Sequence, residues 1–316
     1  MPKKIGRREF IKSGAALGAS VVVGGKLLAK IPGGRAAAPA AGPAAVNVVS
    51  GTDWAAMTAK AVELAGGMSA FVAKGAKVAL LPNVQSKHPG TFTKPDILRT
   101  VIRLCKQAGA AEVACLSYLG QANWDGTGLA QVIQEEGAVL RLIPREDEHW
   151  KPVAIPGAAA LAEARLMKAL DGYGLWINMP ITKDHAGNKF TGTMKNLMGI
   201  NQPTVNRAQF HKPNWKTDPN DIAHLEKCIV DLNFAAKPAL NIVDATEIIK
   251  TNGPMGPGEL IKPGKIVAGV DRVAVDSYCA TLLGFKGEEI VAIRHAAERK
   301  LGEIDLQKAG VREVAV

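Results

Sequence analysis

The chain has 316 residues, is 47% hydrophobic and carries a formal net charge of +10. This composition supports a folded core and excludes a chain that is disordered throughout. Residues 1–40 hold eight Lys and Arg residues against one Glu, so most of the excess charge lies there and the rest of the chain is nearly balanced. A nearly balanced domain lacks the basic surface typical of nucleic-acid-binding proteins, and we expect no nucleic-acid partner.

The first 40 residues have the pattern of an export signal. Residues 7–12, RREFIK, begin with paired arginines and precede an Ala, Gly and Val-rich run over 13–25. This order is typical of a twin-arginine signal, and the run is shorter than the roughly 20 residues of a membrane span. We predict a twin-arginine signal peptide and flexible leader at 1–40 and a periplasmic or otherwise exported protein. The alternatives are an uncleaved signal, which would be the point of membrane contact, and a chance amphipathic helix.

The following sequence alternates short apolar runs with stretches of helical periodicity. Strands are predicted at 46–49, 77–81, 112–116, 139–143, 175–179, 239–244 and 266–270. Helices are predicted at 53–64, 95–107, 129–136, 158–170, 221–233, 271–283 and 287–300. The alternation is typical of βαβ units, and we predict an α/β fold with a mostly parallel sheet of about five to six strands flanked by helices. One domain is expected over 46–300, followed by a C-terminal tail over 301–316.

Two stretches interrupt this alternation. Residues 144–157 are expected to form a connecting excursion between elements. Residues 201–219 are rich in Pro, Asn and Lys and are expected to form a long loop over the surface or over a site.

The four cysteines exclude one class of cofactor site. Cys105, Cys115, Cys228 and Cys279 contain no C-x-x-C pair and no ferredoxin-like spacing. No iron–sulfur cluster is therefore expected from this chain alone, and the identity of any cofactor stays open. Most of these residues are expected to be buried thiols, with one disulfide as the alternative in an exported protein.

The stretch 176–200 changes from an apolar strand to a polar segment, as expected at a ligand site beyond the carboxyl end of a strand. Lys183 and His185 are two residues apart, so an extended backbone directs both side chains to the same side. A helix beginning near Thr193 would offer backbone N–H groups beside Lys195 and Asn196 and would bind a phosphate or carboxylate. The alternative is a solvated Lys and Thr loop with one hydrogen-bonded histidine.

Other polar residues also follow predicted strands. Asn83, Asp244 and Asp271 occupy such positions, with Asp276 five residues further on, and their loops converge if the strands are neighbours. Asp271 has an alternative role as the cap of the following helix.

Metal binding is a second possibility for the same groups. Histidine can exchange a proton or ligate a metal, and the candidate metal ligands are His185, His211 and Asp244. Their sequence spacing does not specify a metal. The Gly and Pro loop over 253–258 either wraps around a ligand or forms a tight turn, and it lacks the Lys and Ser or Thr of a P-loop.

Taken in order, these segments resemble the family known as domain of unknown function 362 (DUF362), from about Val46 to Val291. The matching motifs are Gly51-Thr52-Asp53, Gly66-Gly67 through Val78, Pro82-Asn83, Pro180 with Lys183 and His185, Thr193-Met194-Lys195-Asn196, His211, Val243-Asp244-Ala245, Gly253-Pro254-Met255-Gly256, and Asp271 with Val273, Ala274 and Asp276. One departure is Leu81, where the family has a lysine.

The resemblance implies a link to redox proteins, because family members are often associated with iron–sulfur proteins. Any cluster would belong to a partner, since this chain lacks the cysteines. We expect an anionic substrate or cofactor at Lys183, His185, Lys195 and Asn196, with redox or proton-transfer chemistry. The alternative is a non-catalytic binding or assembly subunit of a periplasmic iron–sulfur or cytochrome redox complex, so enzymatic activity stays open.

Overall fold

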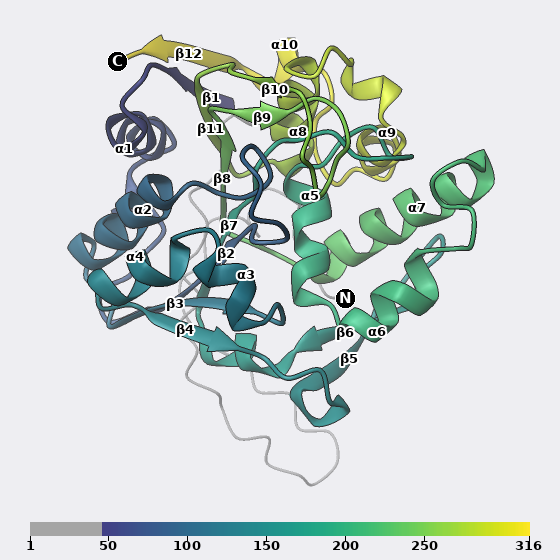
Figure 1. Cartoon of the computed structure of the whole chain (residues 1–316), viewed down its shortest axis with the longest axis horizontal. Coiled ribbons are helices and arrows are strands. Elements are labelled where there is room, and N and C mark those ends of the chain that lie inside the picture. Colours follow the sequence, from purple (N-terminus) through teal and green to yellow (C-terminus); the bar gives the residue numbers. More distant parts are fainter. Residues whose placement is uncertain (1–45) are drawn as a thin grey trace, which may run out of the picture. The chain divides into compact units, whose positions relative to one another are not determined.

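The computed structural model describes residues 46–316, and the predicted export signal lies outside this range. An eight-stranded sheet forms the centre of the molecule, in the order β12-β1-β11-β8-β7-β2-β3-β4 (Figure 1). Its strands are β1 Val46–Ser50, β2 Lys77–Pro82, β3 Glu112–Ser117, β4 Val139–Leu142, β7 Leu175–Met179, β8 Leu240–Ala245, β11 Lys265–Gly269 and β12 Val311–Ala315.

The sheet is mostly parallel. Strands β8, β7, β2, β3 and β4 are parallel to one another, whereas β11 is antiparallel to both β8 and β1. Strand β12 is parallel to β1. The predicted α/β fold is confirmed, with eight strands in the main sheet in place of the expected five to six.

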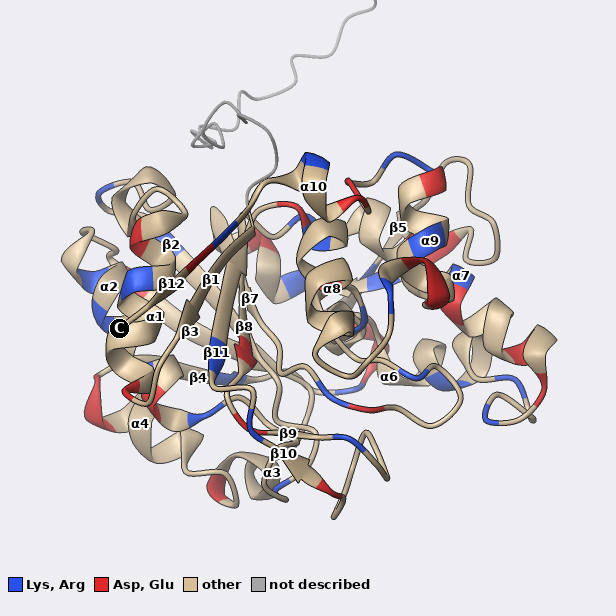
Figure 2. Ribbon diagram, turned by 90° about the horizontal axis from the view of Figure 1, so that it is seen from above, with Lys and Arg blue, Asp and Glu red and all other residues tan. Residues whose placement is uncertain are grey.

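Helices cover both faces of the sheet, as the edge-on view in Figure 2 shows. One face carries α1 Trp54–Leu64, α2 Pro95–Gln107, α3 Gln121–Asp125 and α4 Leu129–Glu135. The other carries α7 Pro219–Ala235, α8 Arg272–Thr281 and α9 Val291–Glu298. Successive residues of a strand point to opposite faces, so Val78 and Leu80 join the first core and Ala79 and Leu81 the second. No helix within residues 46–316 has the length and apolarity needed to cross a membrane.

Shorter elements complete the described chain. They are η1 Met68–Ala70, η2 Asp147–His149, β5 Trp150–Ala154, β6 Glu163–Met167, η3 Lys168–Gly172, α5 Thr193–Asn196, η4 Leu197–Ile200, α6 Pro203–Val205, η5 Asn206–Phe210, β9 Ile248–Ile249, β10 Leu260–Ile261, η6 Gly287–Glu289 and α10 Leu306–Ala309. The expected long loop over 201–219 therefore contains α6 and the π-helical turn η5.

The helix predicted over 158–170 is wrong, because this stretch belongs to an antiparallel hairpin of β5 and β6 that begins in the expected excursion. The backbone N–H groups of Ala159, Ala160 and Leu161 donate to the buried Asp231 carboxylate at 2.7–3.0 Å, which holds the hairpin loop open. Arg299 pairs with the same carboxylate. A carboxylate from the distant helix α7 thus fixes the conformation of this loop, and the local periodicity contains no sign of it.

Residues 301–316 also differ from the expected tail, because they add α10 and β12 to the domain. Strand β12 pairs with β1 in register from Val46 with Val311 to Ser50 with Ala315. Tyr278 of α8 donates a hydrogen bond to Glu313 of β12. The alternation of this short strand was not recognised in the sequence because its side chains are largely exposed.

All four cysteines are buried free thiols. Burial raises the pKa of each of them. The prediction of buried thiols is confirmed, and no disulfide joins these four cysteines.

Deleting residues 311–316 is expected to destabilise the domain by roughly 2–4 kcal/mol, because β1 becomes an unpaired edge and Tyr278 loses its acceptor. Urea unfolding followed by circular dichroism measures the change. Arg312→Ala is the control, since this side chain is exposed and its loss should leave the midpoint within experimental error. An unchanged midpoint in the deletion variant would show that β12 contributes nothing to the fold.

Candidate functional site

The loops that follow β2, β7 and β8 meet at one end of the sheet. Thr93 donates a side-chain hydrogen bond to the Met179 carbonyl at the end of β7 (2.6 Å). The backbone N–H of Thr182 donates to the Asp244 carbonyl at the end of β8 (3.0 Å), and that of Asp184 donates to Ile249 (3.0 Å). The expected convergence of these strand ends is therefore present.

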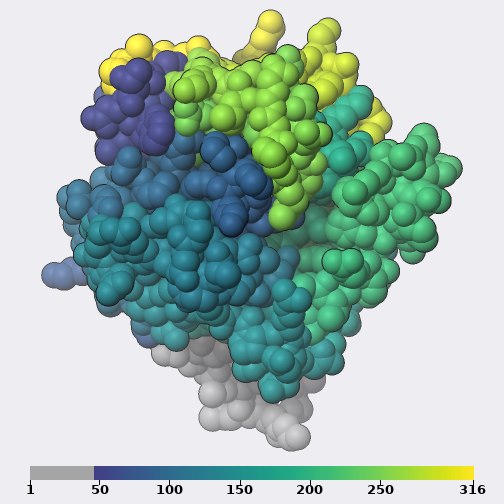
Figure 3. All heavy atoms as spheres, viewed as in Figure 1, coloured from purple at the N-terminus to yellow at the C-terminus, as the bar shows by residue number. Residues whose placement is uncertain are grey.

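The Gly and Pro loop lies over the first of these loops. Ser86 donates a hydrogen bond to the Met255 carbonyl at 2.6 Å, and Figure 3 shows the light green segment near residue 255 against the blue segment near residue 90. The Gly and Pro loop also contacts the segment that follows β7, because the Gly253 N–H donates to the Asp184 carboxylate at 2.8 Å. A side chain at position 253 would overlap the Asp184 carbonyl, which explains the glycine there.

Lys183 lies fully buried where these loops meet. Its Nζ donates to the Thr91 carbonyl at 2.6 Å and to Asn83 Oδ1 at 3.1 Å. Burial, together with the nearby charge of Lys195, lowers the Lys183 pKa to about 7. The structure therefore places Lys183 and Asn83 in direct contact, and holds the amine close to its midpoint of protonation at neutral pH.

A row of asparagine side chains runs from Lys183 across the sheet. Asn83 donates to Asn196 (2.9 Å), Asn196 donates to Asn178 (2.8 Å), and Asn178 donates to Asn241 (3.0 Å). Asn241 then donates to the Gly269 carbonyl at 3.1 Å. Asn178 and Asn241 face each other on the paired strands β7 and β8. The row links the site to the rigid centre of the sheet, so it fixes the position of Asn83 and Asn196.

Lys195 and Asn196 lie on the single-turn helix α5, and its start corrects the sequence interpretation. The N–H groups of Thr193 and Met194 donate to the two oxygens of the Asp276 carboxylate, at 2.5 and 3.0 Å. These are the groups that were expected to bind an anion, and they are already occupied. Burial raises the Asp276 pKa to about 7. Asp276 thus positions α5, and the anion-binding capacity of the site belongs to its side chains.

The side chain of Asn188 connects Lys195 with the carboxylate of Glu226. Its Nζ is 3.5 Å from Asn188 Oδ1, and Asn188 donates to Glu226. Burial lowers the Lys195 pKa to about 8, and the charge of Glu226 opposes this shift. Burial raises the pKa of Glu226 itself. Lys195, Glu226 and Asp276 line a cavity of about 10 Å³, close to the space that one water molecule needs.

His185 is nearly fully buried beside these lysines. Its Nδ1 lies 2.6 Å from the Ala186 carbonyl, so Nδ1 carries the proton and Nε2 is left as an acceptor. Burial lowers the His185 pKa to about 2, and the charge of Lys195 acts in the same direction. The ring is therefore neutral at physiological pH, which differs from the expected exchange of a proton near neutrality.

An aromatic cluster connects His185 with the segment after η5. The Trp215 ring lies 5.5 Å from the His185 ring and 4.9 Å from the His211 ring, measured between centroids. His211 Nδ1 is 3.0 Å from the Asn206 carbonyl, and burial lowers the His211 pKa. The two histidines expected at the site are therefore joined by a tryptophan that the sequence analysis did not single out.

The expectation that Asp271 would converge with the other strand ends is wrong, because β11 is antiparallel to β8 and ends at the opposite end of the sheet. Both Asp244 and Asp271 have structural roles. Asp244 accepts from the Lys94 N–H (3.0 Å) and from Thr246, and so ties the start of α2 to the end of β8. Asp271 caps α8 through the N–H groups of Val273 and Ala274 and also accepts from the Glu303 N–H. The alternative role of Asp271 as a helix cap is the one observed.

The candidate metal ligands are not gathered. Among residues 46–316 no group of three or more His, Cys, Asp or Glu side chains is arranged to hold a metal ion. His185 and His211 lie near the same tryptophan, whereas the Asp244 carboxylate is engaged by Lys94 and Thr246.

The description "Domain of unknown function (DUF362)" belongs to a family model that matches residues 78–281. The chain belongs to this family. The matched segment contains every candidate site residue from Asn83 to Asp276, and so includes the loops that follow β2, β7 and β8. No curated protein sequence matches this chain.

Two solved structures are similar to the DUF362 chain at low identity. A protein from Thermotoga maritima is 13% identical with a TM-score of 0.45, over 78% of this chain and 58% of that one. The lactate racemase apoprotein from Thermoanaerobacterium thermosaccharolyticum is 15% identical with a TM-score of 0.44, over 71% of this chain and 53% of that one. The chain thus spans less than two thirds of either protein, and neither likeness carries an argument about function.

Several site residues were not predicted from the sequence. They are Thr91, Asn178, Asn188, Trp215, Glu226 and Asn241. The sequence does contain an indication for Asn178 and Asn241, since each is an amide inside an otherwise apolar strand. A buried amide needs hydrogen-bond partners, which points to a polar cluster at these positions. Glu226 lies on α7 among residues of helical periodicity, and nothing in its sequence context distinguishes it from a surface position.

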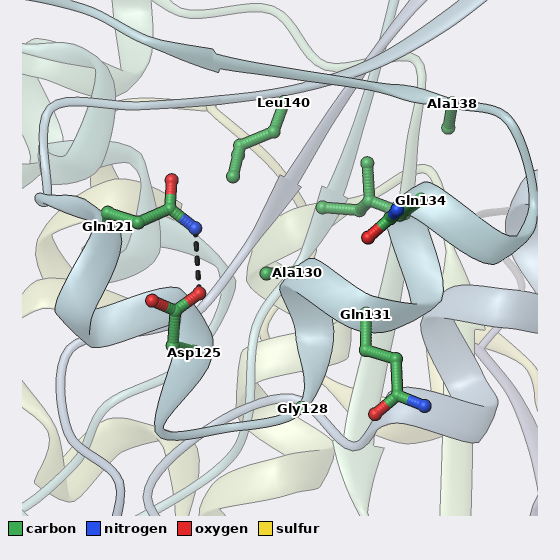
Figure 4. Close-up of a pocket in the computed structure, with 9 residues that line it drawn as sticks. Gln121, Asp125, Gly128, Ala130, Gln131, Gln134, Ala138 and Leu140 are labelled. Carbon is green, nitrogen blue, oxygen red and sulfur yellow. Dashed lines mark hydrogen bonds between the residues drawn. The ribbon is translucent and has the colours of Figure 1, made fainter.

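A separate groove of about 520 Å³ lies between α3, α4 and β4 (Figure 4). Gln121 donates to Asp125 along α3 at 2.7 Å on one side of the groove, and Ala130, Ala138 and Leu140 contribute apolar surface. The groove lies away from the lysine site and shares no lining residue with it.

Gly192→Ala is expected to displace α5, because the new Cβ would overlap the Asp276 carboxylate and the Phe190 ring. We expect a loss of about 1–3 kcal/mol of stability. Gly199→Ala is the matched control in the same segment, since no atom lies within 4 Å of the position that its methyl group would take and it should be neutral. Thermal unfolding of both variants measures the difference, and equal midpoints would contradict the role assigned to Asp276.

Proposed function

We propose that this DUF362 protein binds a small anionic substrate or cofactor at Lys183, Lys195 and His185. The observation that carries the proposal is the fully buried Lys183 beside the partly buried Lys195. Burial lowers the pKa of Lys183 to about 7 and that of Lys195 to about 8, and each shift reflects the cost of holding a cation away from water. A bound anion removes that cost, because it supplies the missing opposite charge.

The groups around the lysines support this assignment. Glu226 is the carboxylate whose charge acts on Lys195, and its own raised pKa reduces the compensation that it offers at neutral pH. Asn83 and Asn196 hold fixed positions in the amide row, and His185 presents a neutral ring. In this proposal the lysine ammonium groups hold the carboxylate or phosphate oxygens, and His185 Nε2 accepts a hydrogen bond from a hydroxyl or N–H group of the same ligand.

Proton transfer is the chemistry that the site favours. An amine with a pKa near 7 is present in both protonation states at neutral pH, which is the condition for a general acid or base. Redox chemistry would need a cofactor or a partner, and we propose an iron–sulfur or cytochrome protein for that role. A non-catalytic binding or assembly subunit is the second candidate function, and it predicts ligand binding without turnover.

Oxalate and inorganic phosphate are expected to bind the purified protein, with Lys195→Met lowering the affinity by about tenfold or more, equivalent to roughly 1.4 kcal/mol. Isothermal titration calorimetry at pH 7 measures both proteins. Lys227→Met is the matched control, because Lys227 is exposed on α7 beside Glu226 and its loss makes the same change of net charge. Equal affinities in the two variants would reject the site.

Anion affinity is also expected to fall as the pH rises from 6 to 9, since both ammonium groups lose protons in this range. The stability of the unliganded protein has the opposite pH dependence: the contribution of the two lysines to the free energy of unfolding rises with pH. The two lysines bind fewer protons when folded than when unfolded between their lowered pKa values and 10.5, so their contribution to stability rises with pH through that window. Ligand-induced thermal stabilisation should therefore be largest at the acidic end.

Export through the twin-arginine pathway is proposed from residues 7–12 alone, which lie outside the described structure. Replacing both Arg7 and Arg8 by Lys keeps the charge and is expected to retain the protein in the cytoplasm of its native host. Cell fractionation with immunoblotting measures the distribution. Lys3→Arg with Lys4→Arg is the control, and unchanged export of the Arg7 and Arg8 variant would reject the signal.

A further inference from the structure

Lys183 has hydrogen-bond partners for two N–H groups, whereas an ammonium has three to place. Thr91 and Asn83 supply these two acceptors, and they are the ones within hydrogen-bond distance of Nζ in the described part of the chain. No carboxylate acts on Lys183 among residues 46–316. A neutral amine donates two hydrogens and keeps a lone pair, so the surroundings of Nζ match the amine and leave an ammonium one acceptor short.

The orientation of the Asn83 amide is fixed by a backbone carbonyl, which can accept a hydrogen bond but cannot donate one. Asn196 Nδ2 donates to the Leu81 carbonyl at 2.9 Å, and a backbone carbonyl can only accept. Asn196 therefore presents its oxygen to Asn83, and Asn83 must present its NH₂ group in return. The oxygen of Asn83 is thereby directed to Lys183, so both groups that contact Nζ are acceptors from the amine hydrogens.

An unused hydroxyl lies on the same side as this amine. Lys183 and Thr191 form an antiparallel bridge, in which each backbone N–H donates to the other residue's carbonyl at 3.2 and 2.9 Å. Directly opposed residues of such a pair place their side chains on one face. Thr191 is 3% exposed, and its Oγ1 has no hydrogen-bond partner in residues 46–316. The hydroxyl therefore has its hydrogen-bonding capacity free for a water molecule or a ligand.

We propose that the Lys183 amine is a covalent attachment point for an anionic carbonyl compound, such as a small 2-oxo acid, whose carboxylate is held by Lys195. This inference rests on the proposed function, because the carboxylate is the anion that the site binds. The nitrogen lone pair attacks the carbonyl carbon and forms a C–N bond. Two hydrogens of the amine leave with the carbonyl oxygen as water, and a C=N imine remains without any change in oxidation state.

Two further observations support the step. Burial and the charge of Lys195 hold the Lys183 pKa at about 7, so about half of the amine is unprotonated at neutral pH. Thr191 lies on the same face of the β-bridge as Lys183, and in this proposal its Oγ1 hydrogen-bonds the oxygen that departs. The Thr91 segment contacts Nζ directly and has to move for a carbonyl compound to enter, because Lys183 is fully buried.

Reductive trapping tests the proposal. The protein is incubated with glyoxylate and sodium cyanoborohydride, and peptide mass spectrometry locates the stable amine adduct. We expect saturable modification at Lys183 that exceeds modification of the exposed Lys74 by tenfold or more, rises from pH 6 to 8, and is blocked by oxalate. Propanal, which lacks the anionic group, should show no preference for Lys183.

Thr191→Val supplies a variant that keeps the fold. It has nearly the same shape and removes a hydroxyl that has no protein partner, so stability is expected to hold or to increase. Trapping at Lys183 should fall severalfold in this variant. Lys183→Arg, which retains a cation and has no primary amine, should abolish the adduct at this position.

The two proposals fail in different ways. Absence of a Lys183 adduct in the wild-type protein, together with oxalate binding that depends on Lys195, would overturn the covalent step and leave anion binding standing. Absence of oxalate binding as well would overturn both. Equal modification of Lys183 and Lys74 would show ordinary surface reactivity and would also overturn the covalent step.

Discussion

The site depends on a row of amides that begins inside the sheet. Asn178 and Asn241 are buried in neighbouring parallel strands, and Asn178 donates to Asn241. Asn196 donates to both Asn178 and the Leu81 carbonyl, which fixes the direction of the hydrogen bonds toward Lys183. A buried amide without partners costs about 1–3 kcal/mol, so these side chains cannot turn independently. The position of Asn83 beside the amine is consequently set by hydrogen bonds that reach as far as β11.

Around this row the structure separates carboxylates that hold the backbone from groups that face a ligand. Asp231, Asp244, Asp271 and Asp276 each accept backbone N–H groups and fix a hairpin, a loop, a helix and the turn α5, respectively. The two lysines of the site receive little of this negative charge. These four carboxylates therefore stabilise the backbone geometry, and Lys183 and Lys195 lie where three loops meet.

Sequence reasoning predicted the fold class because βαβ periodicity is local, and it selected Lys183, Lys195 and Asn196 as site candidates because they follow a strand end. It assigned the N–H groups of α5 to a ligand, since nothing local shows that Asp276 reaches them from the distant helix α8. The helix predicted at 158–170 was wrong for the same reason, because Asp231 captures the N–H groups of 159–161 from α7. Interactions between distant segments decided each case, and a periodic pattern contains no information about them.

The pairing of β1 with β12 joins the two ends of the described chain in one sheet. One edge of β1 therefore stays open during synthesis until β12 has been made, and the closing contact has nearly the greatest sequence separation that the domain allows. A message truncated before β12 would leave β1 as the edge strand, and the side chains of β1 are mostly buried in the complete domain whereas those of β12 are largely exposed. The truncated product would therefore expose an apolar strand at the edge of the sheet, which favours aggregation.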